Sequence, residues 1–92
     1  MIRVKLYATL RDVAGARHLD VPFEVGGTAR ELMQAIAQAS PPLGEKLLDS
    51  DGQPTGFAHI FVDGRNIMWL KDMDTVVGDG NEIDLIPPVA GG

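Results

Sequence analysis

Apolar and polar residues alternate along two stretches near the start of the chain, residues 2–7 and 18–25. Such an alternation is typical of strands that bury one face. Pro22 cannot donate a hydrogen bond to a neighbouring strand, so it places the second strand at an edge of its sheet. The two stretches therefore predict a hairpin with a long connection. Its apolar positions are Ile2, Val4 and Leu6 in the first stretch and Leu19, Val21 and Phe23 in the second.

A helix is predicted to begin after Thr28. The Thr28 hydroxyl can accept a hydrogen bond from the Glu31 backbone N–H while the Glu31 carboxylate accepts one from Thr28, which is a capping box. Pro41 and Pro42 are expected to end this helix, and residues 43–49 predict one further helical turn. The apolar face of the helix consists of Leu32, Met33 and Ile36.

The second half of the chain predicts three short strands. Residues 57–67 are mostly apolar around Asp63-Gly64, a pair favoured in two-residue type I′ hairpin turns, so two strands are expected to meet there. A turn over residues 78–81 precedes a last strand at residues 82–86. Between Met68 and Val77 we expect a loop that tucks three apolar side chains under the core. These are Trp69, Leu70 and Val76.

The order of these elements is strand, strand, helix, strand, short strand, strand. It predicts an α+β fold of the ubiquitin-like β-grasp type, with a mixed β-sheet and one main α-helix packed on one face. The first and last strands would lie parallel in the middle of the sheet. Residues 1–86 would form the domain and residues 87–92 a flexible C-terminal tail. The opposite sheet face would be open to solvent, and it would carry Tyr7, Ile86 and either Phe61 or His59.

Length and charge restrict the class of protein. A chain of 92 residues has room for one domain. Its formal net charge of -5 argues against a nucleic-acid partner, because binding to the phosphate backbone needs clustered Lys and Arg. No stretch approaches the about 20 apolar residues that cross a bilayer, and the start lacks the apolar run of a secretory signal. We therefore expect a cytoplasmic protein without a membrane partner.

The side chains offer no catalytic constellation. The chain has no cysteine, which excludes a disulfide, a thiolate nucleophile and a cysteine zinc site. His18 and His59 lack the spacing of metal ligands, so no metal is expected. Gly26-Gly27 lacks the rest of a phosphate-binding loop, and Ser40 has no histidine nearby in sequence.

The sequence ends in "PPVAGG", residues 87–92. A double proline projects the chain, and Gly91 and Gly92 lack a Cβ, so this segment has the slender backbone that a narrow channel would admit. The terminal carboxylate has an intrinsic pKa of about 3.5 and is ionised at neutral pH, so it could attack the α-phosphate of ATP. From the residues alone, a terminus without a function is favoured over this role, because chain ends are commonly disordered.

Several segments match a known family: "YATLRDVAG" at residues 7–15, "FVDG" at 61–64 and "DGNEIDLIPPVAGG" at 79–92. With them the whole chain resembles the β-grasp sulfur-carrier proteins, whose type member is the small subunit of molybdopterin synthase. The resemblance is most specific from Phe57 onward. It implies that a ubiquitin-activating-type adenylyltransferase adenylates the Gly92 carboxylate with ATP. A sulfur donor, such as a sulfurtransferase, would then convert the adenylate to a thiocarboxylate.

The resemblance also implies roles for individual residues. The Gly92 carboxylate would carry the chemistry, and Tyr7, Phe61 and Ile86 would dock on the activating enzyme and on the sulfur acceptor. The chain would be a carrier and substrate rather than an enzyme, with no bound cofactor, because the partner consumes the ATP. The tail inserted into the partner would be Pro87, Pro88, Val89, Ala90 and Gly91.

The acceptor implied first is the large subunit of molybdopterin synthase, with which the chain would form a synthase complex. The segments at residues 41–64 and 68–77 are longer than in the shortest members. They resemble relatives that supply sulfur for cysteine or for other thiolated metabolites. Archaeal ubiquitin-like modifiers share the same outline, which leaves open an isopeptide linkage through Gly92.

Overall fold

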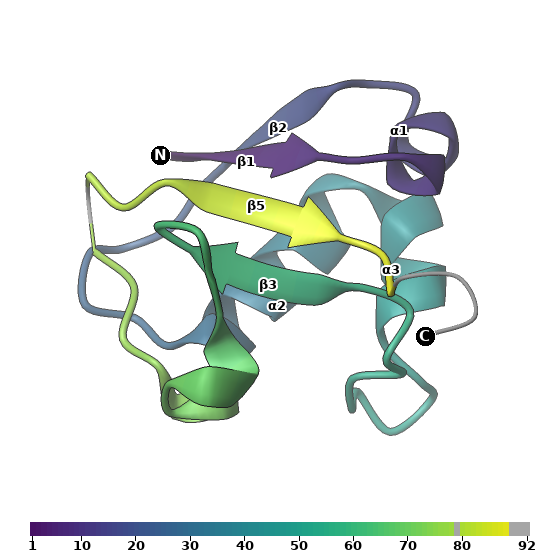
Figure 1. Ribbon diagram of the computed structural model, residues 1–92. Coiled ribbons are helices and arrows are strands. Elements are labelled where there is room, and N and C mark those ends of the chain that lie inside the picture. The colour runs from purple at the N-terminus through teal and green to yellow at the C-terminus, as the bar shows by residue number, and fades with distance from the viewer. Residues whose placement is uncertain (79, 89–92) are drawn as a thin grey trace.

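The computed structural model describes residues 1–78 and 80–88. These residues form a five-stranded mixed sheet in the order β2-β1-β5-β3-β4, with helices on one side of it (Figure 1). The strands are β1 (Ile2–Leu6), β2 (His18–Val21), β3 (His59–Val62), β4 (Arg65–Asn66) and β5 (Ile83–Ile86). The helices are α1 (Thr9–Ala14), α2 (Ala29–Ala39) and α3 (Pro41–Leu47), and the 3-10 turns are η1 (Ile67–Trp69) and η2 (Asp72–Asp74).

The first and last strands lie side by side in the centre of the sheet, as predicted. β1 and β5 pair in parallel, with Val4 opposite Ile83 and Leu6 opposite Leu85. β1 pairs with β2 in the antiparallel sense, and β2 lies at the edge of the sheet, where Pro22 directly follows it. The pattern of apolar positions and the proline therefore predicted the pairing and the edge position correctly, but β2 ends at Val21, before Pro22, and does not continue to Val25 as predicted.

The predicted hairpin at Asp63-Gly64 joins β3 to β4. The φ angles of these two residues are 52° and 84°, and positive φ at both central positions is the mark of a type I′ turn. The Asp63 carboxylate also accepts hydrogen bonds from the Glu82 backbone N–H at 2.7 Å and from the Asn81 side-chain amide at 2.8 Å. The turn is thereby tied to the start of β5.

The helices confirm the capping box and add two features. Glu31 N donates to Thr28 Oγ1 at 3.3 Å, and Thr28 N donates to Glu31 Oε1 at 3.1 Å. α2 ends before the double proline, but the prolines also begin α3, because a proline in a first helical turn removes no intrahelical hydrogen bond. α1 was not predicted. It lies within the expected long connection and is anchored by the buried Leu10.

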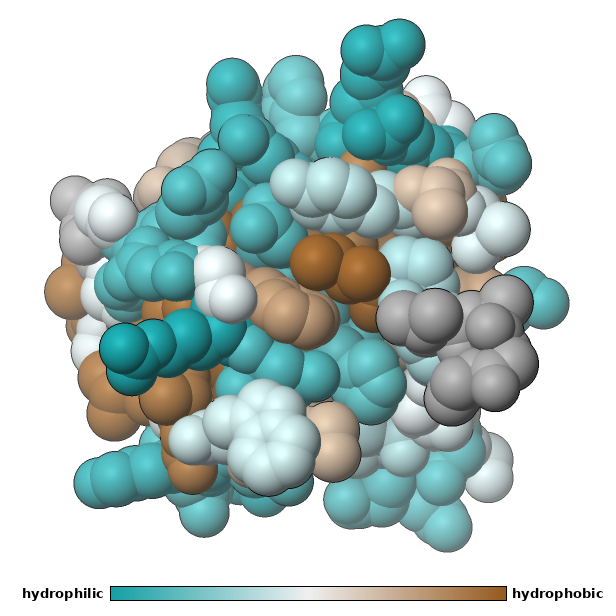
Figure 2. Space-filling model, viewed as in Figure 1, coloured by the Kyte–Doolittle hydropathy of each residue, from teal (hydrophilic) through white to brown (hydrophobic). Residues whose placement is uncertain are grey.

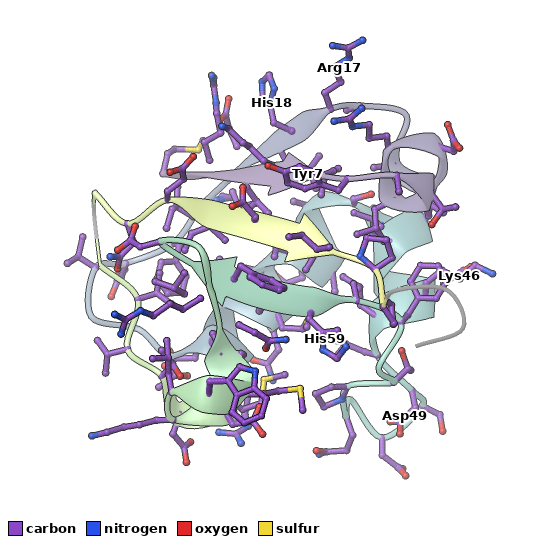
Figure 3. The ribbon with its side chains drawn as sticks, in the orientation of Figure 1. Tyr7, Arg17, His18, Lys46, Asp49 and His59 are labelled. Carbon is purple, nitrogen blue, oxygen red and sulfur yellow. The ribbon has the colours of Figure 1, made fainter. Side chains whose placement is uncertain are left out.

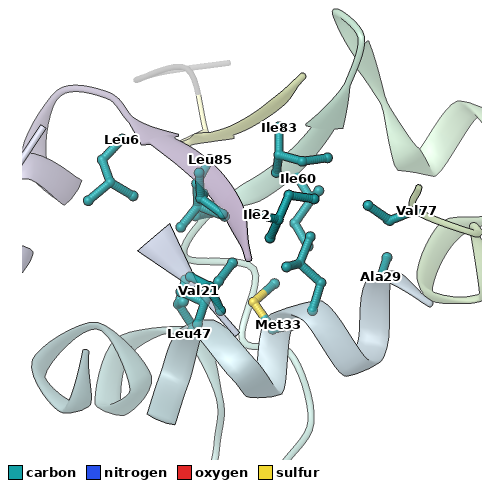
Figure 4. Close-up of a cluster of buried hydrophobic side chains, with 14 of the residues drawn as sticks. Ile2, Leu6, Val21, Ala29, Met33, Leu47, Ile60, Val77, Ile83 and Leu85 are labelled. Carbon is teal, nitrogen blue, oxygen red and sulfur yellow. The ribbon is translucent and has the colours of Figure 1, made fainter. Parts of the chain in front are cut away.

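The core lies between the sheet and α2, with further side chains from α1 and α3 (Figure 4). Full burial of a large aliphatic side chain contributes about 1.5–3 kcal/mol, so this layer holds the strands in register. The largest fully buried side chains are Val4, Leu6, Leu10, Val21, Leu32, Ile36, Leu43, Leu47, Ile60, Val77, Ile83 and Leu85.

The prediction for residues 68–77 is wrong. Trp69 is 84% exposed, Val76 62% and Leu70 38%. Val77 is buried in their place, and because Val76 forms a bridge with Thr28, its side chain points to the opposite side from that of Val77. Ile67 is the other buried anchor, and the 3-10 turn that begins there directs the side chains after it toward solvent.

Gly44 allows α3 to pack closely on α2, and we expect Gly44→Ala to destabilise the fold. A Cβ at this position would lie 2.9 Å from the Ala37 carbonyl oxygen and 3.0 Å from the Ala37 Cβ. The overpacking outweighs the gain in helix propensity, for a net loss of about 1–2 kcal/mol. Urea unfolding measures this, with Glu45→Ala on the exposed side of α3 as the matched control. A Gly44→Ala protein as stable as the control would contradict the prediction.

Candidate functional site

The sheet face opposite the helices brings the three predicted docking residues together, and we call it the open face. Tyr7 directly follows β1, Phe61 lies in β3 and Ile86 ends β5. All three side chains are half-buried. In the strand pairing, Ile86 lies opposite His59 and Phe61 lies opposite Asp84. Hydrophobic side chains gather at the centre of this face, with hydrophilic ones around them (Figure 2).

Tyr7 is held in place by contacts from two elements. The Tyr7 hydroxyl donates to Asp84 Oδ1 at 3.4 Å. The Arg11 guanidinium lies 5.8 Å from the centre of the Tyr7 ring, and its Nε donates to the Leu6 carbonyl oxygen at 2.9 Å. These two contacts therefore hold the ring in place on the open face. Sequence reasoning missed Arg11, because its role depends on α1, which was not predicted.

Two exposed ion pairs flank the apolar centre. Arg3 Nε lies 2.9 Å from Asp20 Oδ1, and Lys5 Nζ lies 3.2 Å from Glu82 Oε1. The hydrogen bond from Arg3 lowers the pKa of the Asp20 carboxyl, and the bond to Glu82 raises the pKa of the Lys5 amine. Because this pKa is lower in the folded protein than in the unfolded chain, the ion pair of Asp20 stabilises the fold at pH values above the ordinary carboxyl pKa. This stabilisation is lost as the pH falls through the lowered pKa. Solvent screening keeps such pairs weak.

The chain beyond β5 leaves the sheet beside this face. Pro87 is half-buried and Pro88 is exposed. The predicted tail residues Val89, Ala90, Gly91 and Gly92 lie outside the described residues. Tyr7 and His59 lie on either side of the end of β5 (Figure 3). The described part of the predicted tail, Pro87 and Pro88, therefore begins beside the open face.

The other candidate sites have structural explanations. His18 and His59 belong to strands that β1 and β5 separate, and the described residues contain no group of three His, Cys, Asp or Glu side chains that could hold a metal. The amides of Gly26 and Gly27 donate to the carbonyl oxygens of Val77 and Glu24, so they do not form an anion site. None of the helices described is long and apolar enough to cross a membrane.

The sheet order and the helix across one face define a ubiquitin-like β-grasp protein. The chain belongs to the ThiS family, whose model matches residues 4–92. It is 37% identical over 65 residues to a putative sulfur carrier protein of Archaeoglobus fulgidus, an alignment that covers 71% of this chain and 74% of that one. The family comprises small sulfur carriers and ubiquitin-like modifiers.

Solved structures extend the likeness over nearly the whole chain. Small archaeal modifier protein 1 of Haloferax volcanii superposes with a TM-score of 0.81 at 28% identity, covering 98% of this chain and 97% of that one. A putative molybdopterin converting factor subunit 1 of Pyrococcus furiosus superposes with a TM-score of 0.73 at 25% identity, covering 95% of each chain. The sulfur-carrier family inferred from the sequence is thus confirmed.

Proposed function

We propose that this protein is a sulfur carrier whose Gly92 carboxylate is adenylated by a ubiquitin-activating-type enzyme and then converted to a thiocarboxylate. The observation that carries the proposal is the position of β5. This strand ends in the apolar centre of the open face, at Ile86, and leads directly into Pro87 and Pro88. The surface suited to a partner therefore lies at the base of the segment that ends in Gly91-Gly92. The family model, which extends to residue 92, supports the same assignment.

The chemistry needs only the terminal carboxylate from this chain. A carboxylate oxygen attacks the α-phosphate of ATP, which forms an acyl adenylate and releases pyrophosphate. Hydrosulfide then attacks the acyl carbon and AMP leaves, which gives the thiocarboxylate. If the persulfide of a sulfurtransferase attacks instead, an acyl disulfide forms, and a thiol must cleave its S–S bond, releasing the thiocarboxylate and forming a disulfide with the donor sulfur. The thiocarboxylate would be the only thiol-type sulfur on the protein, because the sequence has no cysteine. The chain acts as substrate and carrier, and ATP is bound by its partner.

The partners follow from these steps. They are an adenylating enzyme, a sulfur donor such as a sulfurtransferase, and an acceptor enzyme, all in the cytoplasm. We propose the large subunit of molybdopterin synthase as the acceptor, supported by the likeness to the Pyrococcus molybdopterin converting factor subunit. An enzyme that makes cysteine or another thiolated metabolite is the alternative acceptor. Residues 1–86 supply the docking domain and residues 87–92 the tail.

Incubation of the chain with ATP, sulfide and its adenylating enzyme tests the proposal. The intact mass is expected to rise by the difference between sulfur and oxygen, and the fragment that carries the change should contain Gly92. Omission of ATP is the control, because sulfide does not replace a carboxylate oxygen unless the carboxylate has been activated as an adenylate. If the mass does not change although the adenylating enzyme is shown to be active, a sulfur-carrier role would be contradicted.

A second function, as a protein modifier, is favoured by the likeness to small archaeal modifier protein 1. In that case a lysine amine of a target protein attacks the adenylate, or a thioester made from it, and an isopeptide bond to Gly92 results. Digestion of a cell lysate would then yield lysine peptides that carry the C-terminal remnant of this chain. Their absence, together with a thiocarboxylate on the free protein, would restrict the function to sulfur transfer.

A further inference from the structure

A pocket of about 240 Å³ lies between β3, α2 and the two 3-10 turns. We call it the methionine pocket, because three methionine side chains contribute to its wall. Methionine side chains are flexible and polarizable, so they adapt to apolar groups of different shapes. Beside the pocket Trp69 is 84% exposed and Met68 56%. The pocket is lined chiefly by Met33, His59, Ile60, Ile67, Met68 and Met73.

The backbone around the methionine pocket is fixed by specific hydrogen bonds. Asn66 Oδ1 accepts from the Met68 backbone N–H at 3.0 Å, and Thr75 Oγ1 accepts from the Lys71 backbone N–H at 3.0 Å. Arg30 of α2 forms an ion pair with Asp74, in which Arg30 Nη1 lies 2.9 Å from Asp74 Oδ1. Little conformational entropy is therefore lost when a partner contacts this surface. Exposed apolar side chains on a fixed backbone favour a binding role.

The size of the pocket restricts its occupant. Pockets for drug-sized ligands measure roughly 300–1,000 Å³, so this one suits a single apolar side chain. Trp69 adds about 200 Å² of exposed surface, because an aromatic side chain offers about 150–250 Å². A stable interface needs about 800 Å² from each partner. The methionine pocket and Trp69 are therefore too small to hold a second copy of this chain or a partner without help from another surface.

The open face supplies that other surface, and His59 joins the two. His59 lies opposite Ile86 in the strand pairing and also lines the methionine pocket. A protein seated on the open face thus reaches the pocket without a gap between the two contacts. Both the carrier and the modifier functions begin with adenylation, so the adenylating enzyme is the partner that either function requires.

We propose that the adenylating enzyme inserts a Leu- or Phe-sized side chain into the methionine pocket and packs against Trp69. A Lys or Arg of that enzyme lies beside the inserted side chain and faces Asp72. Asp72 lines the pocket and takes no part in the three ion pairs among residues 1–78 and 80–88. The net charge of -5 likewise favours a basic surface. This assignment rests on the proposed function, since it names a contact of the same partner.

Binding of the adenylating enzyme to single variants tests the proposal. Met68→Ser and Trp69→Ser are each expected to weaken the equilibrium affinity about ten-fold, as for central apolar contacts in other interfaces. Asp72→Asn is expected to weaken binding less and to reduce its dependence on salt. Asn tolerates the positive φ of 52° at this position. Val25→Ser is the matched control, because Val25 is 69% exposed and does not line the pocket.

The outcomes separate this inference from the proposed function. If Met68→Ser and Trp69→Ser both bind with full affinity while the wild type is adenylated normally, the proposed role of the methionine pocket is wrong and the proposed function is unaffected. A wild type that is never adenylated would overturn the proposed function. An equal loss of affinity in Val25→Ser would also contradict the role of the pocket, because the effect would then not be specific to the residues at the pocket. Thermal unfolding of each variant is expected to match the wild type, since all four substituted side chains are exposed.

Discussion

Deletion of Gly92 is expected to lower thiocarboxylate formation at least about 100-fold. The deletion moves the terminal carboxylate back by one residue, or about 3.5 Å of extended chain, and a misplacement of about 1 Å can cost 100-fold in rate. Mass spectrometry after incubation with ATP, sulfide and the adenylating enzyme measures the loss. A truncated chain that gains sulfur at the wild-type rate would place the chemistry elsewhere.

Two controls separate the chemistry of Gly92 from folding and docking. The core residues lie between Ile2 and Leu85, so the deletion removes none of them, and the midpoint of urea unfolding should not change. Affinity for the adenylating enzyme should fall far less than the rate does, because Tyr7 and Ile86 remain. Extension of the chain by one glycine is the matched variant, since it displaces the carboxylate in the opposite direction.

Ile86→Asp is expected to weaken docking on the adenylating enzyme about 30-fold or more. The substitution places a charge in the apolar centre of the open face, beside the carboxylate of Asp84, and a partner would have to desolvate it. Titration calorimetry measures the affinity. Because Ile86 is half-buried, some stability is also lost.

Ile86→Leu provides the control, since it keeps the volume and the apolar character of the side chain. Its affinity is expected to stay within a few-fold of the wild type. Unfolding midpoints for both variants establish that each is folded at the assay temperature. If Ile86→Asp bound the enzyme as tightly as Ile86→Leu, the open face would not be the docking surface.

Sequence reasoning worked where a local pattern has a single physical solution. The alternation around Val4 fixed the buried face of β1, and the capping box at Thr28 fixed the start of α2. Asp63-Gly64 gave the hairpin because few pairs tolerate two positive φ angles. The order of these elements then predicted a β-grasp with the first and last strands paired in the middle of the sheet, and with it the open face.

The remaining features depended on tertiary contacts that leave little trace in the sequence. α1 is a short helix held by Leu10, and so few residues carry no clear periodicity. The segment around Trp69 reads as apolar, yet its buried apolar side chains are Ile67 and Val77, and Met73 is partly buried. The two 3-10 turns direct Met68, Trp69 and Leu70 toward solvent. Arg11 contacts the Tyr7 ring because it lies in α1, which begins shortly after β1 and places the Arg11 side chain over the ring.

The pairing of β1 with β5 has a consequence for when the protein becomes recognisable. The open face combines Tyr7, which follows the first strand, with Ile86, which ends the strand made last among those of the sheet. A partner that needs both side chains would not bind a chain in which β5 has yet to join the sheet, because β5 is the central strand. If the proposed function holds, the adenylating enzyme would therefore activate only molecules in which β5 has already paired with β1.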